Sequence, residues 1–290
     1  MSAYILLIIP LGYFIVFKYF PLLNAQIAFK EFSPVDGVFR SRWIGFEHFK
    51  MFFTSFYFIE LIRNTLFYSF AKLLVGVPVA VIFAVALSES RSKFLRKTVQ
   101  TISYVPHFLS WVIMLGILLM LLSPGEGLIN KVLEALGKQP IPFLTNPKTF
   151  PLVIIFSDLW KELGWSAIIF LAALLGIDPS LYEAASAEGA NRFQRVFYIT
   201  LPGILPVVMV VVLLRLGTIL DAGFHQIFIL YSTPVLGVAD IIDTWVYRQG
   251  ILDFQFSLAT AVGLFKGVIG MILLLCANWM IRRMNGTSIY

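Results

Sequence analysis

The feature that most constrains this chain is a series of apolar runs, each about as long as a bilayer is thick. A helix needs roughly 20 mostly apolar residues to cross the hydrocarbon layer. Because backbone polar groups inside a bilayer must be hydrogen-bonded within the protein, such runs predict helices. We therefore predict an all-α polytopic membrane protein with six transmembrane helices, at residues 3–23, 64–87, 102–122, 152–175, 203–220 and 257–281.

Composition supports this class. Of the 290 residues, 59% are hydrophobic and only 13% are charged, whereas soluble proteins carry about 25% charged residues. The net charge of +6 would suggest nucleic-acid binding in a soluble chain, but Lys and Arg lie mainly between the apolar runs. We expect the lipid bilayer as a partner and no nucleic acid. The single cysteine, Cys276, excludes an intrachain disulfide and is expected to be a buried small hydrophobe.

Basic residues indicate the orientation. Four of them lie in the short segment 88–97 between the second and third runs, and Arg282 and Arg283 follow the sixth. By the positive-inside rule we expect these segments, both termini and the loop 178–202 to be cytoplasmic. Residues 123–150 should form an outer loop with one short helix at 129–136. We expect a single domain over residues 1–290, and a natural N-terminus longer than this one, because no basic residue precedes the first run.

The polar segment between the fourth and fifth runs has the most informative pattern. Ser180 and Glu183 form the S-x-x-E pattern of a capping box, which predicts that a short helix begins at Ser180. Gly189 can adopt the positive φ that ends this helix, and Asn191 can cap a second one. We therefore predict two short helices joined at Gly189, the second with an apolar stripe of Phe193, Val196 and Phe197.

The same segment resembles the EAA loop of the membrane subunits of binding-protein-dependent ABC importers. Glu183-Ala184-Ala185, Gly189-Ala190 and Leu201-Pro202 carry the resemblance, and Glu188 replaces the usual aspartate. The resemblance implies the type I permease fold and a loop that couples to an ATPase. The implied coupling residues are Glu183, Ala184, Ala185, Glu188, Gly189, Arg192, Leu201 and Pro202. The alternative is an ordinary amphipathic loop in which Glu183 only caps a helix.

The resemblance also implies a complex. The partners would be a second homologous permease subunit, an ATPase subunit dimer and an extracytoplasmic solute-binding protein, in a bacterial cytoplasmic (inner) membrane. ATP and Mg would be bound by the partner ATPase, since this chain has no G-x-x-x-x-G-K-[ST] motif, and we expect no bound cofactor and no enzymatic activity of its own.

The segment 160–179 resembles permeases for di- and oligosaccharides. The segments 221–247 and 256–263 resemble more narrowly the branch that serves complex polysaccharide fragments, such as alginate or pectin oligosaccharides. This resemblance implies that the importer carries oligosaccharides or polysaccharide fragments. A permease for another solute class, such as a peptide or a phosphodiester, is the alternative.

Charged and aromatic residues inside the runs are candidates for the translocation path, because charges in hydrocarbon are costly and usually face a bundle interior or water. The alternative is a set of structural ion pairs; the spacing of Asp158 and Lys161, for example, allows them to pair. The candidate path residues are Asp158, Trp160, Lys161, Glu162, Trp165, Arg215 and Lys266.

A rival hypothesis is an intramembrane serine protease. Gly164-Trp165-Ser166-Ala167 loosely resembles the Gly-x-Ser-Gly motif of rhomboid proteases, with His225 as a possible base. The alternative is a small-residue contact between helices. The three histidines are isolated in sequence and show no spacing that predicts a metal site.

Overall fold

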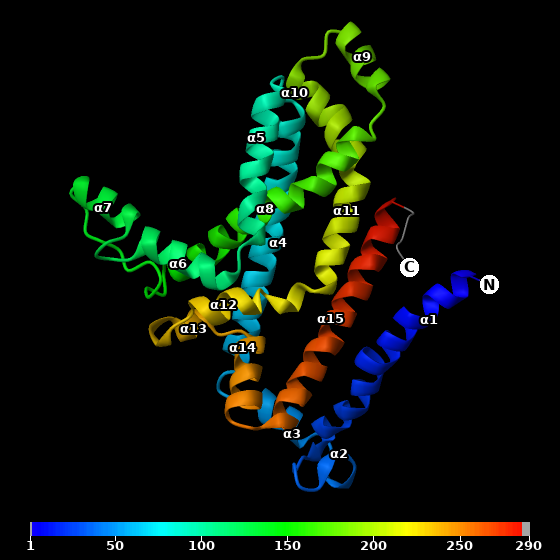
Figure 1. Ribbon diagram of the computed structural model, residues 1–290, viewed down its shortest axis with the longest axis vertical. Coiled ribbons are helices and arrows are strands. Elements are labelled where there is room, and N and C mark those ends of the chain that lie inside the picture. The colour runs from blue at the N-terminus through cyan, green and yellow to red at the C-terminus, as the bar shows by residue number, and fades with distance from the viewer. Residues whose placement is uncertain (1, 286–290) are drawn as a thin grey trace. The chain divides into compact units, whose positions relative to one another are not determined.

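We describe residues 2–285 in a computed structural model of the chain, which is helical almost throughout (Figure 1). Two compact units divide it: Met1–Ile62 with Ile241–Ile269, and Arg63–Asp240 with Gly270–Tyr290. Helices α4 (Phe58–Ser88) and α15 (Phe256–Asn285) each contribute residues to both units.

The first unit begins with one long apolar helical run. Helix α1 continues through a π turn and a 3₁₀ segment, so the run ends at Phe29 and not at residue 23 as predicted. A cluster of aromatic and aliphatic side chains forms the core of this unit, with the buried Phe52 packed against Trp245 and Phe265. The elements are α1 (Ser2–Phe14), β1 (Lys30–Glu31), α2 (Gly37–Arg40), β2 (Arg42–Trp43), α3 (Glu47–Phe53) and α14 (Ile242–Tyr247).

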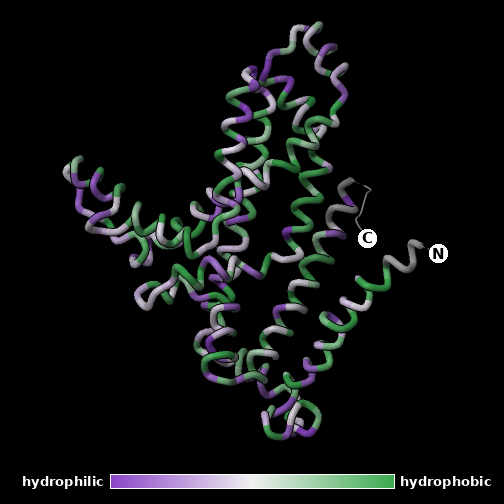
Figure 2. Tube along the Cα trace, in the orientation of Figure 1, coloured by the Kyte–Doolittle hydropathy of each residue, from purple (hydrophilic) through white to green (hydrophobic). Residues whose placement is uncertain are grey.

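The second unit contains most of the membrane helices. Its elements are α5 (Lys93–Tyr104), α6 (Trp111–Leu122), α7 (Leu128–Ala135), α8 (Phe150–Leu175), α9 (Pro179–Ala187), α10 (Arg192–Arg195), α11 (Leu201–Gly217), α12 (Phe224–Leu230) and α13 (Leu236–Ala239). Hydrophobic residues continue along α11 in Figure 2, as expected for a segment that crosses a bilayer. Helix α7 confirms the short helix predicted in the loop 123–150.

Small side chains allow the helices of this unit to approach closely. Ala80 and Ala84 on α4, Ala167 on α8 and Ile204 on α11 are fully buried in one apolar cluster. A Cβ atom at Gly164 would overlap the carbonyl group of Ser103 on α5, so this position needs glycine. The segment 164–167 is therefore a helix-packing contact, as the alternative to the protease hypothesis predicted.

By length and composition, four helices of the described part can each cross a membrane: Leu7–Phe29, Phe58–Ser88, Arg192–Gly217 and Phe256–Trp279. Two further helix pairs pass the same test together, and each is bent. Lys93–Phe108 and Trp111–Leu122 meet at 110°, and Phe150–Leu175 and Pro179–Ala187 meet at 70°. If each bent pair is one span, the total is the six that the sequence predicts.

The third predicted helix is therefore wrong as one continuous segment. The chain is extended at Leu109, and the Ser110 side chain accepts a hydrogen bond from the Ile113 amide at 3.3 Å, which starts α6 in a new direction. Pro106 contributes to the break because it has no amide hydrogen to donate within a helix. On the other side of this span, Ser92 caps α5, so the turn after α4 is shorter than the predicted segment 88–97.

Two other predictions need correction. The fifth helix was expected to begin at Gly203, but it begins at Arg192 and runs through a π turn (Val196–Thr200) into α11 without a break. Cys276 was expected to be buried and is exposed on α15.

Candidate functional site

The loop between α8 and α10 starts with a cap that differs from the predicted one. Asp178, and not Ser180, is the N-cap of α9, since its carboxylate accepts a hydrogen bond from the Ser180 amide at 2.9 Å. Pro179 explains the shift: it has no amide hydrogen, and its fixed φ suits the first position of a helix. The backbone and hydroxyl hydrogen bonds from Ser180 lower the pKa of Asp178. Glu183 lies exposed within α9 and does not cap it.

The end of α9 confirms the predicted glycine turn. Gly189 has a φ of 82°, in the left-handed region. The Ala190 amide donates to the carbonyl of Ala185 at 2.9 Å, and the Gly189 amide donates to that of Ser186 at 3.1 Å. This pair of bonds is the Schellman arrangement, which satisfies the last carbonyls of a helix and reverses the chain.

Asn191 then caps the following helix, as predicted. Its side chain accepts from the Gln194 amide, and the Gln194 side chain accepts from the Asn191 amide at 2.7 Å. The capping box therefore satisfies two of the free amides at this helix start.

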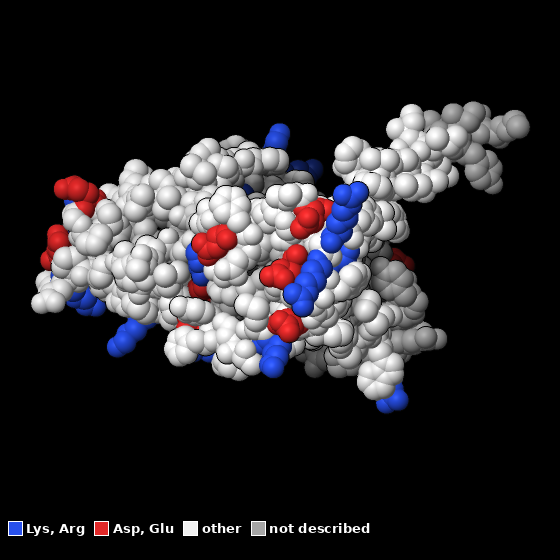
Figure 3. All heavy atoms as spheres, turned by 90° about the horizontal axis from the view of Figure 1, so that it is seen from below, with Lys and Arg blue, Asp and Glu red and all other residues white. Residues whose placement is uncertain are grey.

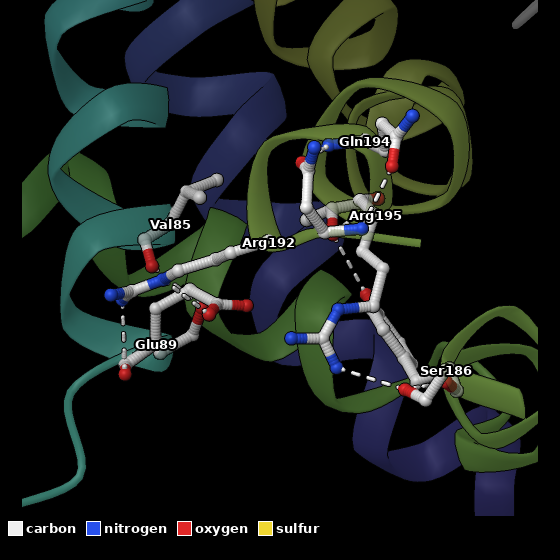
Figure 4. A network of polar contacts seen from close by, with 10 residues as sticks. Val85, Glu89, Ser186, Arg192, Gln194 and Arg195 are labelled. Carbon is white, nitrogen blue, oxygen red and sulfur yellow. Dashed lines mark hydrogen bonds and ion pairs between the residues drawn. The ribbon is translucent and has the colours of Figure 1, made fainter. Parts of the chain in front are cut away.

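Two arginine side chains form hydrogen bonds that join the loop to α4 and join its two arms to each other (Figure 4). The guanidinium of Arg192 donates to the Glu89 carboxylate at 2.9 Å and to the Glu89 carbonyl at 3.2 Å, at the end of α4. Arg195 donates to the Ser186 hydroxyl at 3.1 Å, which links the two arms of the turn.

The loop presents a varied surface. Of the predicted apolar stripe, Phe193 and Phe197 are exposed and Val196 is half-buried. A hollow of about 360 Å³ lies between the two arms, lined by Ala185, Glu188, Gly189, Ala190, Gln194, Arg195, Tyr198 and Ile199. Among the other coupling candidates, Ala184 is exposed in α9, Leu201 packs against the apolar core and Pro202 is exposed in the first turn of α11.

Most candidate path residues take part in polar contacts, but the Asp158–Lys161 pair that the spacing allowed is not among them. Asp158 pairs with Lys72 of α4 at 3.2 Å, and not with Lys161. Lys72 also donates to the side chain of Gln226 and to the carbonyl of Ala222 at 3.1 Å. The pair that the spacing allowed does not form, because spacing along one helix cannot reveal a partner on another helix.

Lys161 is buried, with 7% of its surface exposed. Its ammonium group donates to the carbonyls of Pro106, His107 and Leu109, where the bent span changes direction. The Pro106 carbonyl also accepts from the Leu109 amide at 3.2 Å, so the ammonium group of Lys161 matters most for the carbonyls of His107 and Leu109 at the break.

The other candidate path residues lie in different environments. The Glu162 carboxylate accepts a hydrogen bond from Nδ1 of His107 at 2.9 Å, and the His107 ring stacks on Trp165 with centroids 4.4 Å apart. Trp160 lines an apolar cavity of about 380 Å³ between α6, α7 and α8. Lys266, in the first unit, contacts both carboxylate oxygens of Asp243 at 2.8 Å.

Three of the seven path candidates share one cavity, of about 280 Å³. Sequence reasoning missed Lys72, Ser69 and Asp221, which line it too. A lysine inside the second apolar run was the available signal for Lys72. The lining residues are Ser69, Lys72, Leu73, Asp158, Glu162, Arg215, Thr218, Ile219, Asp221, Ala222 and Gly223.

Charges of both signs also occur together on the surface. On the face shown in Figure 3, acidic and basic side chains lie beside one another and most of the surface is uncharged. Among the described residues, no group of three or more His, Cys, Asp or Glu side chains could hold a metal ion.

Comparison with known proteins defines the class. Residues 76–286 match the family described as "Binding-protein-dependent transport system inner membrane component". The chain is 42% identical over 287 residues to "Protein LplB" of Bacillus subtilis (strain 168), covering 99% of this chain and 90% of that protein. The chain therefore belongs to the family of binding-protein-dependent transport system inner membrane components, as the EAA-type loop predicted.

Two further similarities are more specific. The "Polygalacturonan/rhamnogalacturonan transport system permease protein YteP" of Bacillus subtilis (strain 168) is 40% identical over 278 residues, covering 96% of this chain and 87% of that protein. A solved bacterial ABC transporter "involved in the import of the acidic polysaccharide alginate" matches with a TM-score of 0.91 at 41% identity, covering 98% of this chain and 96% of the other. The second match confirms the predicted helical permease fold.

Proposed function

We propose that this chain is one of two permease subunits of an ATP-driven importer for acidic oligosaccharides. The observation that carries the proposal is the match, over nearly the whole of both chains, to the permease of an alginate importer. The similarity to a polygalacturonan and rhamnogalacturonan permease points to the same chemistry, because these polymers and alginate all contain uronic acids.

The complex would contain this chain, a second homologous permease, an ATPase dimer and an extracytoplasmic binding protein. The related alginate transporter has been solved with a periplasmic protein bound to an alginate pentasaccharide, which supports delivery by such a protein. ATP and Mg are bound by the ATPase subunits, and this chain is a single permease domain over residues 1–290.

The loop 178–202 lies on the cytoplasmic side in this proposal, together with both termini. The basic residues Arg91, Lys93, Arg96 and Lys97 beside the turn after α4 support that orientation. Since the Arg192–Glu89 contact joins the loop 178–202 to the turn after α4, the loop and the turn lie on the same side in this proposal.

The coupling step follows from the geometry of the loop. When ATP binding closes the ATPase dimer, α9 and the Gly189 turn move with it, and the Arg192–Glu89 contact passes the displacement to α4. The two permeases then exchange inward-open and outward-open states around the central path. The residues that contact the ATPase are the exposed ones of the loop, led by Glu183, Ala184 and Glu188.

The purified complex, reconstituted in vesicles with its binding protein, provides the test. We expect uronic-acid oligosaccharides to stimulate ATP hydrolysis and to accumulate inside, whereas neutral oligosaccharides and peptides should do neither. Stimulation by a peptide or a phosphodiester in place of an oligosaccharide would contradict the proposed substrate class. Cleavage of a membrane protein without ATP, abolished by Ser166→Ala, would support the protease hypothesis instead.

A further inference from the structure

The 280 Å³ cavity of the second unit has an unusual lining for a membrane segment. Residues of α4, α8 and α11 and of the segment 218–223 bring two cations and three carboxylates to its wall. Charged groups are too costly to face lipid, so a wall of this kind indicates water-accessible space. Its volume is near the lower end of the range for ligand sites, which is enough for one sugar residue.

Arg215 is the cation of this cavity that lacks a carboxylate partner. One of its terminal nitrogens donates to the Ser166 hydroxyl at 2.7 Å, whereas a guanidinium has five N–H donors. Of the described residues, no carboxylate forms an ion pair with Arg215. Its other terminal nitrogen lies beside Gly76 of α4, where a Cβ atom would be only 3.4 Å away.

Three of the neighbouring charged side chains, unlike Arg215, form ion pairs within the protein. Lys72 is bound to Asp158, and Glu162 is bound to His107. The third carboxylate of the wall, Asp221, lies in the turn between α11 and α12. Arg215 therefore keeps free donors at a cavity whose other cation is already neutralised.

Ser69 provides a second, independent observation. Its hydroxyl is buried, with 6% of the residue exposed, and has no hydrogen-bond partner among the described residues. Ser69 lines the cavity together with Lys72 and Leu73, at the i, i+3 and i+4 positions that share one face of α4. A buried hydroxyl without a partner is costly, and an acceptor inside the cavity would remove that cost.

We propose that this cavity is a subsite for the carboxylate of a uronic-acid residue in the oligosaccharide that passes through the permease. Arg215 pairs with the carboxylate through two N–H groups, because the planar guanidinium matches carboxylate geometry. Ser69 donates a further hydrogen bond, and the carboxylates of Asp158, Glu162 and Asp221 accept from sugar hydroxyls. The inference rests on the proposed function, since it concerns the chemistry of the transported sugar.

Direct binding to the purified complex tests the subsite. The probes are an oligogalacturonate trisaccharide and its carboxyl-reduced, neutral counterpart, titrated by calorimetry without the binding protein. We expect the wild-type complex to bind the acidic trisaccharide about tenfold or more tightly, the ratio that one charge-assisted contact provides. Arg215→Gln should remove the preference, and Arg215→Lys should retain part of it.

Ser69→Ala keeps the test decisive if loss of Arg215 disturbs assembly, because the Ser69 hydroxyl makes no hydrogen bond to another protein group in the described part. It should weaken binding of the acidic trisaccharide severalfold and leave the neutral one unchanged. The control is Lys131→Gln, which removes a cation of an exposed pair outside the cavity and should keep the full preference.

Equal binding of the two trisaccharides by the wild-type complex would overturn the subsite, as would a preference that survives both Arg215→Gln and Ser69→Ala. Failure of the proposed function has a different signature. Vesicles that accumulate uronic-acid oligosaccharides without any binding preference would refute only the subsite, whereas vesicles that accumulate none would refute the function.

Discussion

The guanidinium of Arg192 lies 2.9 Å from the carboxylate of Glu89, 103 positions earlier in the chain. This contact joins the start of the α10–α11 helix to the end of α4, at the base of the loop that is proposed to meet the ATPase. Both side chains are partly exposed, so the contact contributes only about 0.2–1 kcal/mol to stability. We therefore expect this contact to matter for passing motion from the loop to α4, and not for folding.

Arg192→Glu should therefore uncouple the complex without unfolding it. We expect ATP hydrolysis to continue while sugar accumulation in vesicles falls severalfold, because the loop can then move without α4. The swapped pair, Arg192→Glu with Glu89→Arg, should recover much of the accumulation. If the single variant transports at the wild-type rate, or the swap recovers nothing, the contact does not transmit the motion.

Gly189→Val should also uncouple hydrolysis from uptake. A β-branched residue at a φ of 82° carries a strain of about 1–2 kcal/mol, and the turn would relax by moving α9. Gly137→Val is the matched control, since Gly137 also has a positive φ, 74°, but lies after α7 and away from the loop. Equal uncoupling by both variants would show that strain, and not the position of the turn, is responsible.

Lys161→Gln should lower the melting temperature of the purified complex by several degrees. The shorter amide cannot reach the carbonyls of both His107 and Leu109, and each buried acceptor left without a donor costs about 1–3 kcal/mol. Lys131→Gln, in the exposed pair with Glu126, should leave the melting temperature unchanged. An unchanged melting temperature combined with a lost sugar response would instead place Lys161 in the path.

The lowered pKa of Asp178 predicts that acid destabilises the start of α9. The pKa of Asp178 is lower in the folded loop than in the unfolded chain. The ionised carboxylate therefore stabilises the start of α9 at a pH above the unfolded pKa of Asp178. This stabilisation is lost as the pH falls through the lower, folded pKa. Hydrogen exchange of the first α9 amides should accelerate in wild type as pH falls below about 4, relative to unstructured peptide controls. Asp178→Asn should remove this excess acceleration, since an uncharged amide caps at every pH. The same acceleration in both proteins would mean that another group titrates.

The orientation is testable with single cysteines placed in a Cys276→Ala background, because Cys276 is exposed. A cysteine at Ser92 should react with an impermeant thiol reagent only from the cytoplasmic side, and one at Asn146 only from outside. The reverse pattern would invert the proposed topology.

Local chemistry explains which parts of the loop the sequence predicts. Gly189 and Asn191 act through their own backbone and side chain, so their roles follow from residue type. The cap at Asp178 was missed because two caps compete there, and Pro179 decides between them. The Lys72–Asp158 pair and the bend at Ser110 depend on contacts between helices, which periodicity along one helix does not contain.

The apolar runs predicted the helical fold, and four of the predicted spans are single helices that can cross a membrane, because burial in lipid depends on local hydropathy. The distribution of charges was less informative. A Lys or Arg inside a membrane segment is energetically costly. Only its neighbours tell whether a carboxylate, carbonyl groups or a polar cavity surrounds the charge, as Lys72, Lys161 and Arg215 illustrate.

The unbroken helix from Arg192 to Gly217 also acts as a lever arm. Its first residue is held at Glu89, and Arg215 lies near its other end, about 35 Å away at 1.5 Å per residue. A tilt of about 5° at the base would displace the Arg215 end by about 3 Å, the length of one hydrogen bond. A small rotation at the loop is therefore sufficient to change which groups the far end of the helix can reach.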